Sequence, residues 1–168
     1  MAQGLVAYSK HGKVFRVHPT AIVEDGAEIG EGTVIWHFAH VRSGAKIGRF
    51  CVVGKGVYVE GEVGNFCKLQ NNVNIYKGVV LEDYVFIGPN ATTTNDLWPK
   101  AAEPEWKITP TLIKTGASVG AGAVVRCGVT LGHNCMVGAG CVVTKNVPDN
   151  ATWVGIPGRN LWEEGKSE

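Results

Sequence analysis

Polar side chains suited to binding a sugar are concentrated in two stretches of this 168-residue chain. His37 and His40 stand in the segment "WHFAH", and amides and hydroxyls fill the segments "QNNVNIY" (residues 70–76) and "GPNATTTND" (residues 88–96). Asn and Thr side chains donate and accept hydrogen bonds, and histidine also takes up or releases a proton near neutral pH. These side chains could hold a hydroxylated ligand and assist proton transfer if the fold brings the stretches together.

An internal period of six residues predicts such a fold. Aliphatic residues recur at every sixth position in three series, over residues 23–53, 63–87 and 113–143. A small or β-branched residue follows each aliphatic by four positions, and glycine often follows it directly, as in Ile29-Gly30. A helix cannot give this period, and a single strand would give a period of two. Short strands separated by corners, three to each 18-residue coil, predict an all-β parallel β-helix of about six stacked coils.

Stacking in such a solenoid places residues 18 positions apart above one another. The second series begins two residues early, so the offset falls to 16 across the segment "GKGVYVEGE", residues 54–62. With these offsets, His40, Asn74 and Thr92 lie in one outward ladder. The sequence therefore predicts a polar, sugar-binding wall along one edge of the prism. The Asn residues at the neighbouring corners would also serve the fold, because Asn tolerates the left-handed backbone conformation.

The five cysteines fit the same pattern. Four of them occupy the small inward register and are predicted to be core residues: Cys51, Cys67, Cys135 and Cys141. Cys127 falls at a corner and is predicted to be a surface residue. An odd number of cysteines without a C-x-x-C pair argues against a disulfide framework and against a structural zinc knuckle.

One segment interrupts the period. "ATTTNDLWPKA", residues 91–101, follows the second series, and the aliphatics resume at Ile113. Residues 94–112 are too many for a corner, so we predict that they form an arm that leaves the solenoid beside the polar wall. A long loop in an otherwise compact repeat protein is usually functional.

Charge and hydropathy argue against several classes of function. The net charge is +1 and the cations are scattered, so there is no basic patch for nucleic acid or for an anionic membrane surface. The apolar stretches are too short to span a bilayer, and the N-terminal residues lack the order of a signal peptide. We expect a cytoplasmic protein that binds neither nucleic acid nor membranes.

Residues 17–160, with repeats of the type Ile-Gly-x-x-Ala-x, resemble the hexapeptide-repeat family of left-handed β-helix acyltransferases. The segments "KLQNNVNIYKGVVLEDYVFIGPNATTTND" and "NVPDNATWVGIPGRN" are similar to the N-acetyltransferases that act on 3-amino nucleotide sugars. The resemblance implies a left-handed parallel β-helix and a homotrimer with active sites between subunits. It implies acetyl-CoA-dependent acetylation of the 3-amino group of a UDP-2-acetamido-3-amino-2,3-dideoxy-glucuronate type of sugar, for surface polysaccharide synthesis. A dTDP-3-amino-3,6-dideoxyhexose is the alternative substrate.

The resemblance also implies roles for residues of the wall and the arm. Asn95 would hold the sugar amine or the reacting carbonyl, and the leaving thiolate of coenzyme A would accept the proton. A mechanism with His40 or Asp96 as general base stays open. The substrate-binding residues would be His37, Gln70, Asn72, Asn74, Tyr76, Asn90, Asp96 and Lys100.

For acetyl-CoA, the resemblance points to the C-terminal coils. Backbone amides would meet the pantetheine, two cations would bind the phosphates, and the segment "VGIPGR" would line the adenine end. The residues concerned are Gly120, Gly122, Gly138, Ala139, Lys145, Ile156, Pro157 and Arg159. No metal is expected.

The predicted organisation is one β-helix domain over residues 1–160 with the arm inserted, and a tail at 161–168 for which a short helix is one option. Trp153 and Trp162 are predicted to cap the open end of the prism. Two other classes stay open. A metal lyase of the γ-carbonic-anhydrase type would need three histidines at one site, for which the chain offers His37, His40 and His133. A non-catalytic solenoid scaffold would instead show regular Thr ladders and no arm.

Overall fold

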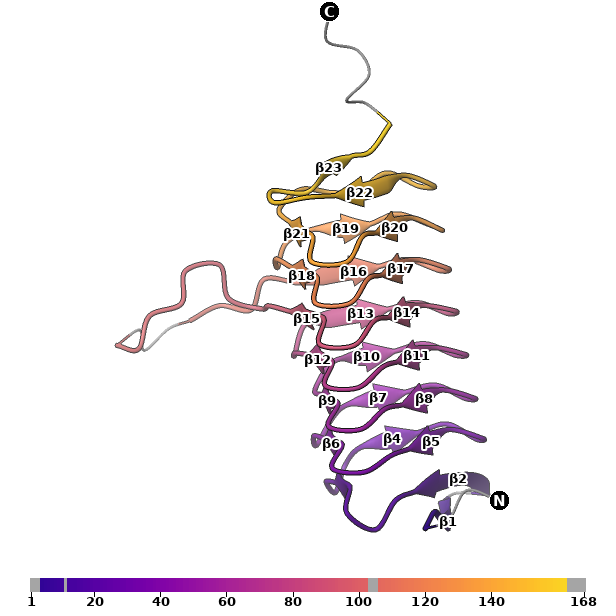
Figure 1. The fold of residues 1–168 in the computed structure, drawn as a ribbon. Coiled ribbons are helices and arrows are strands. Elements are labelled where there is room, and N and C mark those ends of the chain that lie inside the picture. Colours follow the sequence, from indigo (N-terminus) through magenta and orange to yellow (C-terminus); the bar gives the residue numbers. More distant parts are fainter. Residues whose placement is uncertain (1–3, 11, 103–105, 163–168) are drawn as a thin grey trace, which may run out of the picture.

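Short β-strands wind into a three-sided prism in the computed structural model, which describes residues 4–10, 12–102 and 106–162 (Figure 1). Successive strands fall in turn on three sheets, here called faces A, B and C, and each coil crosses them in that order. The coil is left-handed (Figure 1). The predicted fold class, an all-β left-handed parallel β-helix, is therefore confirmed, and the described residues contain no helix.

Face A has ten strands and forms both ends of the solenoid. Its outermost strands, β1 and β23, run antiparallel to β2 and β22, while the others are parallel. Eight coils therefore cross this face, whereas the sequence predicts about six. The inward column of face A is longer than the periodic aliphatic series, because Val17 extends it at one end and Trp153 at the other. The strands are β1 (Val6–Lys10), β2 (Lys13–Val17), β5 (Val34–Ile35), β8 (Val52–Val53), β11 (Lys68–Leu69), β14 (Phe86–Ile87), β17 (Ser118–Val119), β20 (Met136–Val137), β22 (Thr152–Val154) and β23 (Arg159–Asn160).

Faces B and C have seven and six parallel strands. The strands of face B are β3 (Ile22–Val23), β6 (His40–Val41), β9 (Tyr58–Val59), β12 (Asn74–Ile75), β15 (Thr92–Thr93), β18 (Val124–Val125) and β21 (Val142–Val143). Those of face C are β4 (Glu28–Ile29), β7 (Lys46–Ile47), β10 (Glu62–Val63), β13 (Val79–Leu81), β16 (Thr111–Ile113) and β19 (Thr130–Leu131).

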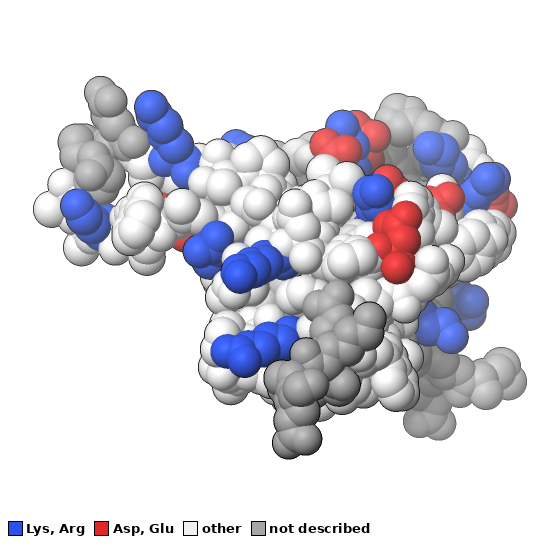
Figure 2. Space-filling view, turned by 90° about the horizontal axis from the view of Figure 1, so that it is seen from above, with Lys and Arg blue, Asp and Glu red and all other residues white. Residues whose placement is uncertain are grey.

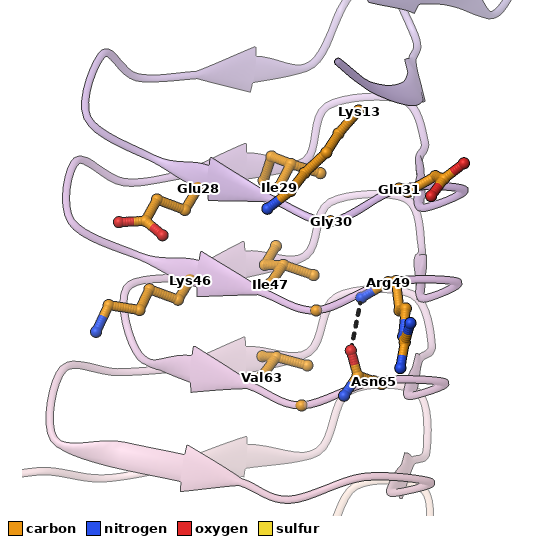
Figure 3. Close-up of a pocket in the computed structure, with 12 residues that line it drawn as sticks. Lys13, Glu28, Ile29, Gly30, Glu31, Lys46, Ile47, Arg49, Val63 and Asn65 are labelled. Carbon is orange, nitrogen blue, oxygen red and sulfur yellow. Dashed lines mark hydrogen bonds between the residues drawn. The ribbon is translucent and has the colours of Figure 1, made fainter. Parts of the chain in front are cut away.

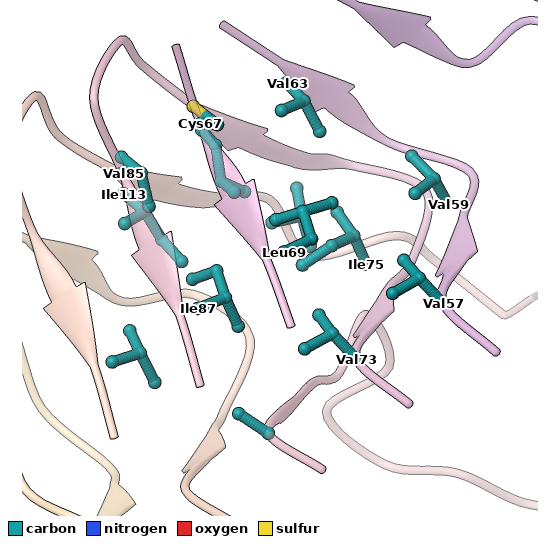
Figure 4. Packing of buried hydrophobic residues seen from close by; sticks show 14 of the residues in the cluster. Val57, Val59, Val63, Cys67, Leu69, Val73, Ile75, Val85, Ile87 and Ile113 are labelled. Carbon is teal, nitrogen blue, oxygen red and sulfur yellow. The ribbon is translucent and has the colours of Figure 1, made fainter. Parts of the chain in front are cut away.

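The core is a single column of aliphatic and small side chains inside the prism. Leu69 of face A and Ile75 of face B meet in the interior, and both are fully buried (Figure 4). Burial of each such side chain contributes about 1.5–3 kcal/mol, and no coil can bury its inner side without its neighbours. The four cysteines of the inward register are buried, as predicted.

Two predictions about individual residues are wrong. Cys127 is fully buried, because it lies against the base of the arm in the coil above, where its backbone N–H donates to Thr94 Oγ1 over 2.9 Å. Trp153 packs on the last coil and caps the core, but Trp162 is 77% exposed and caps nothing. Residues 161 and 162 form a turn, and the rest of the predicted tail lies outside the described residues.

One coil is two residues shorter than the others, and the shortening lies at its corner between faces B and C. The register pairs Tyr58 with Asn74 across sixteen positions, and only Glu60 and Gly61 separate β9 from β10. A Cβ on Gly61 would lie 2.5 Å from the carbonyl oxygen of Val79. Glycine is therefore required at this tight corner by the close approach of the next coil.

The arm leaves after β15 and returns at β16, and it projects sideways from the prism (Figure 1). Its two ends are paired, because the N–H of Thr109 donates to the carbonyl oxygen of Asn95 over 2.9 Å. The excursion covers residues 95–110. Thr111 and Leu112, which are predicted to lie in the arm, belong to β16.

Candidate functional site

The outward side chains of face B form the ladder that the sequence predicts. Parallel pairing brings His40, Asn74 and Thr92 into one column, with Tyr58 between His40 and Asn74. Tyr58 is absent from the sequence-based prediction because its coil is the shortened one, although its place in "VYV" could have revealed it. Above Thr92 the column continues with Val124 and Val142. The column therefore changes from polar to apolar at the level of the arm.

An amide pair lies on the edge between faces A and B, next to this column. Asn72 Nδ2 donates to Asn90 Oδ1 over 3.1 Å, and both residues are exposed. Their φ angles are 59° and 60°, so the predicted corner role is confirmed. Asn74 Nδ2 lies 3.4 Å from the carbonyl oxygen of Asn72. Three of the predicted substrate-binding residues are thus brought together.

Two threonines fix the base of the arm. Thr93 points inward and is 2% exposed; its Oγ1 donates to the carbonyl oxygen of Asn74 over 3.1 Å and accepts from the N–H of Tyr76 over 3.2 Å. Thr94 Oγ1 accepts a hydrogen bond from the backbone N–H of Cys127, which lies in the coil above. Asn95 follows directly and is half-buried at the edge between faces B and C. Its position is therefore set by the coils on both sides of the arm.

His40 lies in a charged cluster below this point. Its Nε2 is 2.7 Å from Glu24 Oε1, and Arg42 Nε is 2.9 Å from the same oxygen. The pKa of Glu24 is lowered to about 2, first by the N–H of Ser43, which donates to Oε2 over 2.9 Å, and then by His40. Glu24 is thus a carboxylate at neutral pH and fixes the ring of His40, which also meets Tyr58 edge-on at 5.7 Å.

The two residues predicted to be catalytic are not brought together within one protomer. Three strand spacings separate His40 from Thr92, roughly 14 Å in all. Asn95 follows Thr92 by three residues, at the far edge of face B. Asp96 lies beside Asn95, and its Oδ1 accepts from the N–H of Trp98 over 2.9 Å.

His37 lies in the turn after β5, at the edge between faces A and B, and Gln70 directly follows β11 of face A. His37 stacks on His18 with ring centroids 3.5 Å apart. Together with other side chains, these two residues line a groove of about 320 Å³ beside the edge between faces A and B. The lining residues are Trp36, His37, Val52, Gly54, Lys55, Leu69, Gln70 and Asn71.

The C-terminal coils bring together several residues predicted to bind acetyl-CoA. Lys145, Pro157 and Arg159 line one hollow of about 490 Å³. Gly120 packs against the backbone of Ala139, where a Cβ would lie 2.5 Å from the nitrogen, so it is needed for stacking. Gly122 is different, because a Cβ there would meet nothing within 4 Å. A Cβ on Gly138 would lie 3.0 Å from the side chain of Val154 in the next coil.

The arm holds two further predicted substrate-binding residues. Asp96 and Lys100 line a hollow of about 290 Å³ with Trp98 and Trp106, and Trp98 is 77% exposed. Seen from the C-terminal end, Lys and Arg side chains predominate on the side of the molecule that carries the arm (Figure 2). Tyr76 follows β12, at the edge between faces B and C, and is exposed. Its ring centroid lies 5.5 Å from that of Tyr58.

A groove of about 530 Å³ lies on face C near the N-terminal end and contains none of the predicted site residues (Figure 3). Its charges are mixed, with Lys46 and Arg49 beside Glu28 and Glu31. Asn65 Oδ1 accepts from the N–H of Arg49 over 3.0 Å, which ties two coils together. This groove offers no convergent set of groups for acyl transfer.

Two further observations concern metals and membranes. Among residues 4–10, 12–102 and 106–162, no group of three His, Cys, Asp or Glu side chains could hold a metal ion. His133 lies at the edge between faces C and A, away from His37 and His40. Within the same ranges, no helix is long and apolar enough to span a membrane.

Comparison with known proteins decides the family. Residues 26–61 and 110–145 match the bacterial transferase hexapeptide (six repeats) family. Over 146 residues the chain is 41% identical to the dTDP-3-amino-3,6-dideoxy-alpha-D-galactopyranose 3-N-acetyltransferase of Aneurinibacillus thermoaerophilus, covering 85% of this chain and 75% of that protein. The chain belongs to the hexapeptide-repeat transferase family. The resemblance drawn from the sequence is therefore confirmed.

Two further proteins share less sequence with this chain. Serine acetyltransferase of Bacillus subtilis is 34% identical over 126 residues, and the match covers 75% of this chain. The chain spans about half the length of that relative, 49%. Among solved structures, the acetyltransferase domain of PglB from Neisseria gonorrhoeae, in complex with acetyl coenzyme A, is 26% identical with a TM-score of 0.52. That match covers 88% of this chain and 57% of the other.

Proposed function

We propose that this hexapeptide-repeat protein transfers an acetyl group from acetyl-CoA to the amine of a nucleotide-linked amino sugar. One observation carries the proposal: Asn95 stands where the outward column of face B changes from polar to apolar. Below it lie amides and hydroxyls suited to a sugar, and above it lie the open Gly122 and cations suited to coenzyme A. A group held at the base of the arm would meet both substrates.

The sugar would bind the polar wall below the arm. Asn72, Asn74, Asn90 and Thr92 lie within two coils of one another and present donors and acceptors that match ring hydroxyls. The Asn72–Asn90 pair is exposed, so it is free to exchange solvent for a ligand. The amine would then lie close to Asn95.

Acetyl-CoA would bind above the arm as the second substrate. Val124 and Val142 offer an apolar strip for the pantetheine, and Gly122 leaves the neighbouring edge without a side chain. Lys145 and Arg159 line one hollow at the C-terminal end, where two cations suit the phosphates. The acetyl complex of the PglB domain supports the same choice of acyl donor.

The chemistry requires the neutral amine to attack the thioester carbonyl. The N–C bond forms, the C–S bond breaks, and the proton of the amine passes to the departing thiolate, which leaves as a thiol. Asn95 donates a hydrogen bond to the carbonyl oxygen as it becomes an oxyanion, or accepts one from the amine. Alignment of the two substrates contributes most of the rate, up to roughly 7–11 kcal/mol in ideal cases.

His40 is the weaker candidate for the base, because the ladder separates it from the arm by three strand spacings. Asp96 lies closer to the proposed reaction centre and stays the alternative. A pH profile of turnover for Asp96→Asn would distinguish this route from proton transfer to the thiolate.

The substrate type that we propose first is UDP-2-acetamido-3-amino-2,3-dideoxy-glucuronate, used for surface polysaccharide synthesis in the cytoplasm. A dTDP-3-amino-3,6-dideoxyhexose is the second candidate, and the 41% identity to an enzyme named for such a substrate favours it. Both carry a 3-amino group, so the same wall and the same reaction serve either one.

We also propose that the protein acts as a homotrimer with its sites between subunits. The outer part of the arm projects away from its own prism, and Trp98 and Trp106 on it are 77% and 51% exposed (Figure 1). Large apolar side chains on a projecting arm favour contact with another surface. The adjacent prism of a symmetric oligomer would supply it.

The deciding experiment is a thiol-release assay with acetyl-CoA and a panel of amino nucleotide sugars. The panel contains UDP- and dTDP-linked 3-amino sugars, with the matching 3-hydroxy sugars as controls. Release of thiol with the amines alone, together with an acetylated product by mass spectrometry, would support the proposal. No release with any amine, from a protein that is folded and trimeric, would reject it.

A further inference from the structure

A slot opens on face A between the side chains of Trp36 and Gln70. The two residues lie two coils apart, in the column that continues the pairings of Ile35 with Val53 and of Val53 with Leu69, and both line one groove. The residue between them in this column is Gly54, which has no side chain. Two strand spacings, about 9.6 Å, therefore separate the coils that carry the indole and the amide.

This width suits one flat ring. Two surfaces that both touch a ring must lie about 7–8 Å apart, because carbon atoms in contact are about 3.5–4.0 Å apart. The groove has a volume of about 320 Å³, and Val52 and Leu69 are among the residues that line it. The stacking of the coils also requires glycine at position 54, since a Cβ there would lie 2.9 Å from the carbonyl oxygen of Leu69. The slot is open because this position cannot carry a side chain.

The rim of the groove has the chemistry of a nucleotide site. Trp36 is half-buried, and its indole lies parallel to the ring of His37, at 5° and 6.1 Å. Lys55 is exposed on the rim, and its backbone N–H donates to Asn71 Oδ1 over 3.1 Å, which fixes that amide. None of the described residues that line the groove is acidic. An anionic ligand with an aromatic base would meet no opposing carboxylate there.

The groove also adjoins the polar wall. Asn71 lines the groove, and Asn72, the next residue, begins the amide pair on the edge between faces A and B. A ligand with its base in the slot would thus carry its sugar toward the edge and the face B ladder.

We propose that the groove between Trp36 and Gln70 binds the nucleoside diphosphate part of the substrate. This inference rests on the proposed function. The indole stacks on the base, the amides of Gln70 and Asn71 bond to its polar edge, and Lys55 binds the diphosphate. Uracil and thymine share the ring and the polar edge, so UDP and dTDP both fit.

The test is equilibrium binding of UDP and dTDP, measured by calorimetry on the full-length protein. Lys55→Gln should weaken the binding of both about tenfold and leave the binding of uridine unchanged. Trp36→Leu should weaken UDP and uridine alike, by about tenfold. The matched controls are Lys46→Gln, on face C, and Trp162→Leu, at the exposed C-terminal end, and both should bind as the wild type does.

A photoreactive UDP analogue gives a second readout that needs no variant. After irradiation of the wild-type protein, the label should be found on peptides that contain Trp36, Lys55 or Gln70. Unchanged affinities in both groove variants, labelling confined to other peptides, or no binding of either nucleotide to the wild type would overturn the inference. If one of these results is found and the wild-type protein still transfers acetyl groups, only the inference about the groove is wrong and the proposed function stands. Labelling in the groove without any acetyl transfer would reject the proposed function alone.

Discussion

Thr94 Oγ1 accepts a hydrogen bond from the backbone N–H of Cys127 over 2.9 Å, and this bond ties the coil below the arm to the coil above it. The two residues are 33 positions apart, and Cys127 is fully buried. A buried N–H without a partner is costly, so this hydroxyl holds the arm base together as well as setting the place of Asn95.

Thr94→Val should therefore lower the free energy of unfolding by about 1–3 kcal/mol, because the shape is kept and the N–H of Cys127 loses its acceptor. Urea denaturation measures the change. Turnover should fall as well, since Asn95 is no longer fixed. Thr130→Val, an isosteric change on the outward side of face C, is the control and should have little effect on either quantity. A Thr94→Val protein as stable as the wild type would show that the bond is unimportant.

Asn95→Ala should reduce kcat about 10²–10³-fold, the effect of removing one hydrogen-bond donor to an oxyanion. The free energy of unfolding should change little, because Asn95 pairs with Thr109 through its backbone carbonyl and not its side chain. Asn95→Asp keeps the shape but lacks the N–H donor, so it should be as slow as the Ala variant. Full activity of Asn95→Asp would show that the residue accepts a hydrogen bond from the amine, and full activity of both variants would remove Asn95 from the mechanism.

Lys145→Gln and Arg159→Gln should each raise the KM for acetyl-CoA about tenfold, the cost of one charged contact to phosphate, with kcat unchanged. Steady-state kinetics with acetyl-CoA and with its dephosphorylated analogue measures this. The defect of the residue that binds the 3′-phosphate should disappear with the analogue. Lys46→Gln is the matched control on face C. Equal KM values in all three variants would place the phosphates elsewhere.

The Glu24 carboxylate should make stability depend on pH in the acid range. Its pKa falls from 4.5 to about 2 on folding, mainly through the N–H of Ser43. A lowered pKa stabilises the fold above pH 4.5, and this contribution is lost as the pH falls toward 2. Unfolding by urea at a series of pH values should show a steeper loss in the wild type than in Glu24→Gln. Parallel curves for the two proteins would contradict the assignment.

A complementation experiment tests whether the arm acts on a neighbouring subunit. Lys100→Glu alters the outer arm, Asn74→Ala alters the wall, and each homotrimer should be nearly inactive. In trimers assembled at random from a 1:1 mixture, about a quarter of all interfaces should combine an intact arm with an intact wall of the adjacent subunit, so activity should return to that extent. Each variant alone, refolded in the same way, is the control. No recovery in verified mixed trimers would show that the arm and the wall of one protomer work together.

The fold could be read from the sequence because its period is local and strict. An aliphatic at every sixth position, such as Ile35 and Ile47, allows only one way to keep every large side chain inside, and the offset of 18 or 16 then fixes which residues stack. The ladder of His40, Asn74 and Thr92 followed from counting alone.

Other features depended on the tertiary structure. Cys127 has the sequence position of a corner residue, but it is buried because the arm base covers it. The six-residue period does not predict Tyr58 in the ladder, because its coil is two residues short and falls between two of the aliphatic series. His37 and His40 are three residues apart, yet His37 lies in the turn at the edge between faces A and B, whereas His40 lies in a strand of face B. The separation of His40 from Asn95 follows only from the stacking of whole coils. The repeat alone determines which side chains point into the core and which point to the surface. Contacts between distant segments depend on where the corners fall, which only the tertiary structure shows.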